Sequence, residues 1–345
     1  MRVFSDPHLG LNRKAHTTPQ SRKDLAEAIH EAAFNAASAG NPETAICAGD
    51  LFDKFSNSEE VIIESVKVAE QCDLILAGNH DSLNQSDVQG SLDVVAQLLA
   101  ERTTEVSACP AFGISHVDHG NYEGMDIAVV PHHPTQELFD EAIQGILNDF
   151  VPVRAIFFHC NYDNPLASGS DTSLNITEEQ VLKLLKFCDY VFIGHEHQPR
   201  ELLDGRLIIT GNPHPTSFGD ISDKYYWDLT STEVTKTLCW EMETGYIEID
   251  LGDGSVWPAP PKNTSFIDIT GKLTADKGAD LAQFIQDVWH NCAPLMVRNS
   301  VEIVTGDTIE ATPVDIASLP DQIEGQLKDT PLATKYTYYR GIVKC

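Results

Sequence analysis

Long hydrophobic runs are absent from this sequence. Charged residues interrupt every apolar stretch well short of the ~18 to 20 residues that a membrane-spanning helix needs. The N-terminal MRVFSD likewise lacks the apolar core and the small-residue cleavage site of a secretory signal. We therefore expect a cytoplasmic protein that has no membrane as a partner.

Basic residues are scarce. The chain has 23 Lys and Arg residues against 52 Asp and Glu residues, which gives a formal net charge of −29. Such a charge opposes non-specific attraction to nucleic acids and to anionic membranes. A polyanionic substrate must therefore be held locally, by metal ions or by the basic segment LNRKAHTTPQSRKD. Its candidate substrate-binding residues are Arg13, Lys14, Arg22 and Lys23. A solvated loop is the alternative interpretation of this segment.

Closely spaced cysteine pairs are also missing. None of the eight cysteines belongs to a CxxC motif, and most lie in apolar surroundings, so we expect reduced, buried thiols. The length of 345 residues predicts about two domains. With 42% hydrophobic and 22% charged residues, the chain has the composition of a packed globular protein.

What the sequence does contain is an alternation of short apolar runs with segments of helical periodicity, which predicts an α/β fold. The strand-like runs are TAIC, DLILA, AIFF and YVFI, and the helix-like segments cover residues 22–37, 58–72, 91–102 and 177–188. The last helix is expected to open with a capping box of Thr177 and Gln180. Polar side chains follow each strand-like run directly. In open α/β sheets, active sites form at this carboxyl end of the strands.

These polar side chains are metal-ligand types. The candidate set contains two carboxylates, one amide and four imidazoles, from Asp6, His8, Asp50, Asn79, His159, His195 and His197. Such a mixture suits two divalent ions of intermediate hardness, such as manganese, iron or zinc. Glycines at positions 49, 78 and 194 precede three of the ligands, where the absence of a Cβ atom permits close backbone approach.

Each ligand-bearing fragment has a structural interpretation when it is taken alone. DPH, GDLFD and GNHD are compatible with ordinary turns, HCN can supply a core histidine, and GHEH can be a surface pair. Their order favours a shared metal site, because every fragment follows a strand-like run and none lacks its ligand. His132 and His133 also follow an apolar run, but we expect them to be incidental loop residues.

The series DPH, GDLFD, GNHD, HCN and GHEH resembles the signature of the calcineurin-like metallophosphoesterases. This resemblance implies a two-sheet sandwich flanked by helices, with two metal ions at the strand ends. It implies that one ion is held by Asp6, His8, Asp50 and His197, and the other by Asp50, Asn79, His159 and His195. His80 would then act on the scissile phosphate and the leaving oxygen, with Asp81 orienting its ring.

The residues after GHEH resemble one branch of this family, the SbcD-type DNA nucleases. A strand there leads into GNPHPTSFGD, in which His214 is either a substrate contact or a turn residue. The resemblance implies a Mn²⁺-dependent nuclease subunit of an SbcCD-like recombination and repair complex, which degrades duplex ends and cuts single strands or hairpins. Its partners would be DNA, an SbcC-type ATPase and a second copy of the chain. The chain is similar in length to phage recombination nuclease subunits. The expected compartment is the cytoplasm of a bacterium or of a phage-infected host.

The Pro-rich stretch DGSVWPAPPKN predicts a domain boundary. We expect residues 1–255 to form the nuclease domain and residues 264–345 to form a small α/β cap domain that helps to seat DNA. Two other functions remain open: a phosphodiesterase or phosphatase that acts on a nucleotide or another small phosphoester, and a non-catalytic scaffold. The complete set of ligands favours catalysis over the scaffold.

Overall fold

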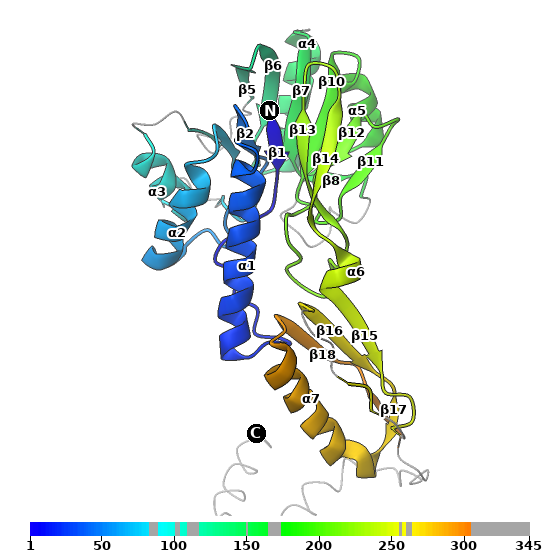
Figure 1. Ribbon diagram of the computed structural model, residues 1–345. Helices are drawn as coiled ribbons and strands as arrows, with labels where there is room; N and C mark the ends of the chain where they lie inside the picture. Colours follow the sequence, from blue (N-terminus) through cyan, green and yellow to red (C-terminus); the bar gives the residue numbers. More distant parts are fainter. Residues whose placement is uncertain are drawn as a thin grey trace, which may run out of the picture.

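Within the residues that the structure describes, two six-stranded sheets make up the upper part of the molecule in Figure 1. The computed structural model describes residues 1–82, 89–100, 104–108, 117–149, 151–164, 174–254, 257–259 and 264–304. The first sheet has the order β14 (Val234–Trp240), β13 (Lys224–Leu229), β1 (Arg2–Phe4), β2 (Ala45–Cys47), β3 (Leu74–Leu76) and β4 (Glu105–Ser107). The second has the order β11 (Arg200–Leu202), β12 (Leu207–Ile209), β10 (Cys188–Gly194), β7 (Val153–His159), β6 (Met125–Val130) and β5 (Asp118–Tyr122).

The strands that precede the candidate ligands are parallel to their neighbours. In the first sheet β1, β2, β3 and β4 run in one direction, and in the second β6, β7, β10 and β12 do the same. Their carboxyl ends therefore lie at one edge of each sheet. The expected α/β sandwich is confirmed.

Helices cover the outer faces of both sheets. The first sheet is covered by α1 (Pro19–Ser38), α2 (Glu59–Ala69) and α3 (Ser91–Leu98), and the second by α4 (Gln136–Asp149) and α5 (Glu178–Leu184). The four helices expected from periodicity are all present. Thr177 and Gln180 form the expected capping box, with Gln180 N donating to Thr177 Oγ1 at 3.2 Å.

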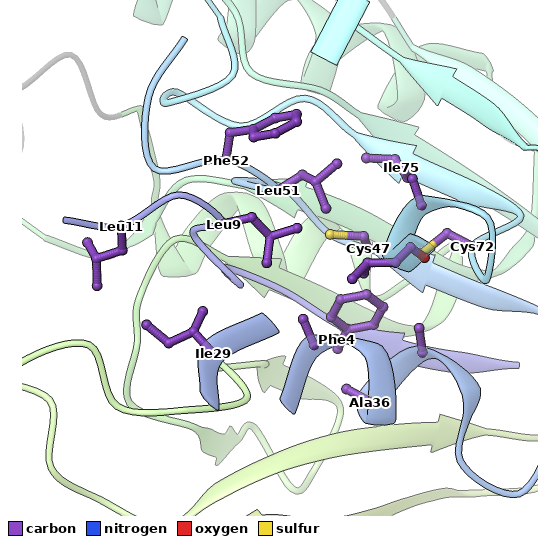
Figure 2. Close-up of a cluster of buried hydrophobic side chains, with 14 of the residues drawn as sticks. Phe4, Leu9, Leu11, Ile29, Ala36, Cys47, Leu51, Phe52, Cys72 and Ile75 are labelled. Carbon is purple, nitrogen blue, oxygen red and sulfur yellow. The ribbon is translucent and has the colours of Figure 1, made fainter. Parts of the chain in front are cut away.

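Strand alternation divides the core into three layers, because successive side chains point to opposite faces of a sheet. Val3 and Phe157 lie between the two sheets. Their neighbours point outward: Phe4 packs under α1 in the same cluster as Ile29 (Figure 2), and Phe158 packs under α4. All five side chains are buried, and each contributes about 1.5 to 3 kcal/mol relative to an exposed position. This packing on both faces keeps the short strands rigid beneath the loops that carry the ligands.

A smaller lobe follows β14 of the first sheet in the chain and lies at the foot of Figure 1. The helix α6 (Met242–Gly245) leads into a parallel sheet of β15 (Tyr246–Asp250), β16 (Phe266–Thr270) and β18 (Met296–Asn299). The lobe is completed by β17 (Lys272–Thr274), β19 (Glu302–Val304), the 3-10 turn η1 (Ala275–Lys277) and α7 (Gly278–Cys292). Its own core contains Ile249, Ile267, Ile269, Phe284 and Val288. We call residues 246–304 the cap lobe.

The cap lobe begins earlier in the chain than the Pro-rich stretch. β15 falls within residues 1–255, which we assigned to the first domain, yet it pairs with β16 along its whole length. Parallel pairing with a strand beyond the Pro-rich stretch draws β15 into the second lobe. Residues 305–345 of the expected cap domain lie outside the described residues.

Among the described residues, the helices are each too short or too polar to traverse a bilayer. The described cysteines are free thiols, and Cys47, Cys72, Cys160 and Cys188 are buried. A further short sheet pairs β8 (Asn161–Tyr162) with β9 (Asn175–Ile176), directly after the ligand-bearing end of β7.

Candidate metal centre

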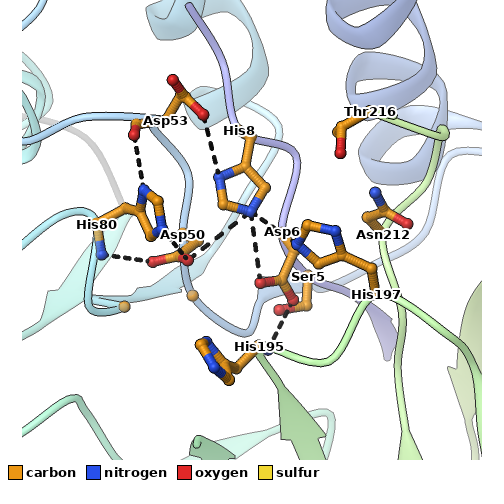
Figure 3. A network of polar contacts seen from close by, with 12 residues as sticks. Ser5, Asp6, His8, Asp50, Asp53, His80, His195, His197, Asn212 and Thr216 are labelled. Carbon is orange, nitrogen blue, oxygen red and sulfur yellow. Dashed lines mark hydrogen bonds and ion pairs between the residues drawn. The ribbon is translucent and has the colours of Figure 1, made fainter. Parts of the chain in front are cut away.

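The seven candidate ligands come together at the carboxyl ends of five strands. Asp6 and His8 follow β1, Asp50 follows β2, Asn79 follows β3, His159 ends β7, and His195 and His197 follow β10. The segments after β1 and β2 run side by side, since Asp6 N donates to Gly49 O at 3.0 Å and His8 N donates to Asp50 O at 3.1 Å. Residues from both sheets therefore converge on one site, which Figure 3 shows from close by.

One group of donor atoms centres on two imidazoles. The Nε2 atoms of His8 and His197 face each other at 3.0 Å, and Asp6 Oδ1 lies 3.9 Å from His8 Nε2. Asp6 Oδ1 is buried without a hydrogen-bond partner, while Asp6 Oδ2 accepts a hydrogen bond from His195 N at 2.8 Å. A buried carboxylate oxygen with no partner is costly, and a metal ion would satisfy it.

A second group of donor atoms lies beside the first. Asn79 Oδ1 is 3.1 Å from His159 Nε2 and 3.0 Å from His195 Nδ1. Asp50 Oδ2 is 3.3 Å from His159 Nε2 in this group and 3.8 Å from His8 Nε2 in the other. Asp50 therefore stands between the two groups, as a bridging ligand must.

The donor set fits two divalent ions. Asp6, His8 and His197 form one cluster that can hold a metal ion, and Asp50, His159 and His195 form another. Imidazole nitrogens mixed with carboxylate and amide oxygens are typical ligands of divalent transition metals such as manganese, iron and zinc.

The backbone at the site is held in an unusual conformation. Asp6, His8, Asp50 and His195 have φ values of 55°, 48°, 50° and 88°. Residues other than glycine rarely adopt positive φ, and each such residue costs on the order of 1 to 3 kcal/mol unless its surroundings impose it. Here the strain turns ligand side chains out of their strands toward the shared site.

Two of the expected glycines are required by close contacts. A Cβ atom on Gly49, whose φ is 111°, would lie 1.9 Å from His159 Nδ1. A Cβ atom on Gly78 would lie 2.1 Å from Asp50 Oδ1 and 2.4 Å from Asp50 N. The site is therefore packed so tightly that the ligand-bearing loops fit together only without these side chains.

Asp50 and His159, which face each other in the site, influence each other's pKa. Burial alone would raise the pKa of the Asp50 carboxyl, but the facing His159 imidazole and the nearby His8 ring hold it well below its ordinary value. Burial alone would lower the pKa of His159, but Asp50 and Asp6 raise it to about 10. In the metal-free protein the two residues therefore form a buried ion pair. Metal binding requires a neutral imidazole, so it must displace this proton.

His80 lies beside the ligands without sharing their burial. Its backbone N donates to Asp50 Oδ1 at 2.9 Å, and its ring Nε2 lies 4.0 Å from Asp50 Oδ2. The side chain is 40% exposed, whereas that of Asp50 is 1% exposed. An imidazole that is open to solvent and adjacent to buried ligands can reach a substrate that the ions hold.

The position of Asp81 corrects one expectation. Its carboxylate does not orient the His80 ring, because it accepts hydrogen bonds from three backbone N–H groups, of Leu51, Phe52 and Gly78, at 3.0 to 3.1 Å. The group that faces His80 Nδ1 is instead the carbonyl oxygen of Asp53, at 2.7 Å. Asp81 therefore ties the loop after β2 to the loop after β3. Burial and the nearby Asp50 raise its pKa to about 7.

The expected substrate-binding residues are placed in three different ways. Arg13 and Lys14 are exposed in the loop that leaves the metal site after His8. Arg22 and Lys23 lie in the first turns of α1, where Arg22 Nε donates to Thr18 O at 3.3 Å. His214 is buried against the rings of Trp240 and Phe266, so its expected contact with substrate is not supported.

Three polar residues near the site were not predicted as part of it. Asp220 Oδ2 lies 3.3 Å from His197 Nδ1, and the fully buried Lys224 donates from Nζ to His197 O at 2.9 Å. Burial lowers the pKa of Lys224 to about 8, although Asp220 and Asp6 oppose the shift. His132 is buried after β6, next to β7, and burial together with nearby His159 lowers its pKa to about 3. The GD pair that closes GNPHPTSFGD was the only sequence signal for Asp220.

A two-sheet sandwich with paired clusters of Asp, Asn and His at its strand ends defines a metal-dependent hydrolase. The family model of calcineurin-like phosphoesterases matches residues 2–199, which is more than half of the chain. The protein belongs to this family, and its domain is that of a metal-dependent phosphoester hydrolase. All seven candidate ligands lie within the matched residues.

Proposed function

We propose that the protein is a Mn²⁺-dependent DNA nuclease, the nuclease subunit of an SbcCD-like complex with an SbcC-type ATPase. It would degrade duplex ends as an exonuclease and cut single strands or hairpins as an endonuclease. The complete ligand set supports catalysis, and the resemblance of the segment after GHEH to SbcD-type nucleases supports this branch of the family.

The chain's own residues have distinct tasks in this proposal. One ion would be held by Asp6, His8, Asp50 and His197, and the other by Asp50, Asn79, His159 and His195. When bound, the two ions supply a hydroxide nucleophile at neutral pH and offset the negative charge of the phosphate. The exposed ring of His80 would hold a proton at Nε2 for the leaving oxygen, and its Nδ1 is already directed to Asp53 O.

The observation that supports DNA as the substrate is the position of the basic loop, residues 11–18. It starts three residues beyond His8, exposes Arg13 and Lys14, and then contacts the cap lobe, where Val297 N donates to His16 O at 2.9 Å. Figure 1 shows this loop reaching the cap lobe just before α1. A positively charged bridge from the metal site to a second lobe suits a polymer longer than one nucleotide. Its local positive charge can also attract phosphate groups, although the net charge of −29 repels them.

A salt titration tests the basic loop. Replacing both Arg13 and Lys14 by Ala should weaken DNA binding and make its salt dependence less steep, because fewer counterions are released. Lys183 and Lys186, at and just beyond the end of α5, are the matched control, since they precede the amino end of β10 whereas His195 and His197 follow its carboxyl end. An unchanged slope in the loop variant would count against the proposed DNA path.

Cleavage of end-labelled linear duplex and single-stranded DNA tests the activity itself. We expect degradation in Mn²⁺ that EDTA abolishes and that both Asp50→Ala and His80→Ala remove. The net charge of −29 favours the alternative, a phosphodiesterase or phosphatase for a small phosphoester, because a small substrate needs no extended basic surface. If a chromogenic phosphodiester is hydrolysed while DNA stays intact with every metal tested, this alternative replaces the nuclease.

We also propose a homodimer through α2 and α3. Ile63 on α2 and Leu98 on α3, at 62% and 59% exposed, are the two most exposed large hydrophobic side chains of the described residues, and Figure 1 shows both helices on the outside of the molecule. Exposed apolar side chains that lie close together are typical of a protein interface, and α2 packs against α3.

A further inference from the structure

His197 is contacted on both ring nitrogens. Nε2 faces the metal position, 3.0 Å from His8 Nε2, and Nδ1 lies 3.3 Å from Asp220 Oδ2. Histidines that bind metals usually direct the second nitrogen to a carboxylate or a carbonyl, which fixes the tautomer and the ring orientation. A proton on Nδ1, shared with Asp220, leaves the Nε2 lone pair free for the ion.

Asp220 is itself held in place. It is buried, and it accepts hydrogen bonds from Ser217 N at 2.9 Å, from Thr216 N at 3.0 Å and from Asn212 Nδ2 at 2.9 Å. Figure 3 shows Asn212 and Thr216 beyond His197, on the side away from Asp50. With these donors on both oxygens, the carboxylate has little freedom to rotate away from the imidazole.

Lys224 joins the two residues from the other side. Its side chain is fully buried on β13, and Nζ lies 4.0 Å from Asp220 Oδ2 while it donates to His197 O at 2.9 Å. A buried ammonium is costly unless it is paired and hydrogen-bonded. Here one amine contacts both the carboxylate beside the ligand and the ligand's own backbone, so the three residues form one connected unit.

His159, a ligand of the second ion, has a different partner at the corresponding position. His159 Nδ1 lies 3.0 Å from the neutral carbonyl oxygen of Ala48, not from a carboxylate. An imidazole whose second nitrogen donates to a carboxylate is a stronger metal ligand than one whose second nitrogen donates to a carbonyl. The reason is that the carboxylate better stabilises the proton on that second nitrogen. The two metal positions should therefore respond differently to a change at Asp220.

We propose that Asp220 is a positioning residue for the ion that His197 binds, and that Lys224 fixes Asp220 and the His197 backbone relative to each other. This inference rests on the two-ion site of the proposed function, but not on DNA as the substrate. It assigns to the GNPHPTSFGD segment a role in holding the metal, through a side chain that touches neither the ions nor the substrate.

Titration with Mn²⁺ alone tests the proposal, with calorimetry or electron paramagnetic resonance as the readout and no nucleic acid present. The wild-type protein should bind two ions. Asp220→Asn should bind one ion as the wild type does and the other 10- to 100-fold more weakly. In a His197→Ala background the same substitution should add no further loss, because the two side chains act through one ligand.

Ser217→Ala is the matched control. Its hydroxyl lies 3.4 Å from Asp220 Oδ1 and does not contact the oxygen that faces His197, so Mn²⁺ binding should stay at the wild-type level. If Asp220→Asn does not fold, Asp220→Glu takes its place. It keeps the negative charge beside Lys224 but displaces the carboxylate by one methylene group, and the same loss of a single ion is expected.

The outcomes separate this inference from the proposed function. Equal binding of two ions by the wild type and by the folded Asp220 variant would overturn the role of Asp220 and leave the two-ion site standing. Equal weakening of both ions would also overturn it, since that result indicates general damage to the fold. Failure of the wild type to bind Mn²⁺ would overturn the two-ion site and this inference together.

Discussion

At the scale of single residues, His80 stands apart from the side chains around it. The seven candidate ligands direct nitrogen or oxygen atoms toward each other, whereas His80 contacts Asp50 through its backbone N–H and leaves its ring partly open to solvent. The motif order in the sequence was enough to predict all these residues as a group. It was not enough to predict their partners. The contact between His80 and Asp53 O depends on how the loop after β2 folds back, which no local spacing encodes.

His80→Ala should separate catalysis from metal binding. We expect phosphoester cleavage to fall by about 10²- to 10⁴-fold, the usual contribution of a general acid or base. The number of bound Mn²⁺ ions should not change, because the hydrogen bond between His80 and Asp50 is made by the backbone. His8→Ala is the comparison, since it removes a ligand and should reduce both quantities. Loss of Mn²⁺ from the His80 variant would show that this ring is a ligand instead.

The ion pair of His159 and Asp50 should make the stability of the metal-free protein depend on pH. The pKa of His159 is raised from 6.5 to about 10 in the folded protein, chiefly by Asp50 and against the effect of burial. The pair therefore stabilises the fold fully between about pH 3.8, the ordinary pKa of Asp50, and about pH 6.5, and this contribution is lost as the pH rises toward 10. Thermal unfolding in EDTA should show a falling midpoint over this range. His159→Gln should show a shallower fall, and an identical slope would contradict the ion pair.

At the scale of secondary-structure elements, periodicity predicted what depends on nearby residues. The helices around Leu25, Val68, Val95 and Val181 were all predicted from the sequence, because each presents apolar side chains three and four residues apart to a sheet. Strand pairing over long distances was not predictable. β13 returns antiparallel beside β1 from more than 200 residues away and brings Lys224 under His197, and β15 joins the cap lobe by pairing with β16.

Glycine substitutions in a loop and in a helix should have opposite effects. Gly78→Ala places a Cβ atom 2.1 Å from Asp50 Oδ1, so we expect a loss of about 1 to 3 kcal/mol in the free energy of unfolding together with weaker Mn²⁺ binding. Gly145→Ala, inside α4, meets no atom within 4 Å and should stabilise the protein by about 0.5 to 1 kcal/mol. Chemical denaturation of both variants gives the comparison. A neutral effect of Gly78→Ala would show that the loops after β2 and β3 can move apart.

At the scale of the whole molecule, the distribution of exposed apolar side chains bears on assembly. Ile63 and Leu98 are more exposed than Leu182, which is 46% exposed on α5 and belongs to the helices over the second sheet. We expect light scattering to show a dimer at micromolar concentration. Ile63→Asp combined with Leu98→Asp should give a monomer, and Leu182→Asp should leave the dimer intact. A wild-type monomer under these conditions would remove the proposed interface.

The division of the ligands between the two sheets has a mechanical consequence. Each ion would join side chains that follow strands of the first sheet to side chains that follow β7 or β10 of the second. The ions would then act as cross-links at one edge of the sandwich. They would hold the two sheets together there, in addition to the apolar layer around Phe157. Chelation would remove these cross-links and leave the ligand-bearing loops at that edge less constrained. Resistance of the ligand-bearing loops to proteolysis would consequently report how many metal positions are filled, without any measurement of catalysis.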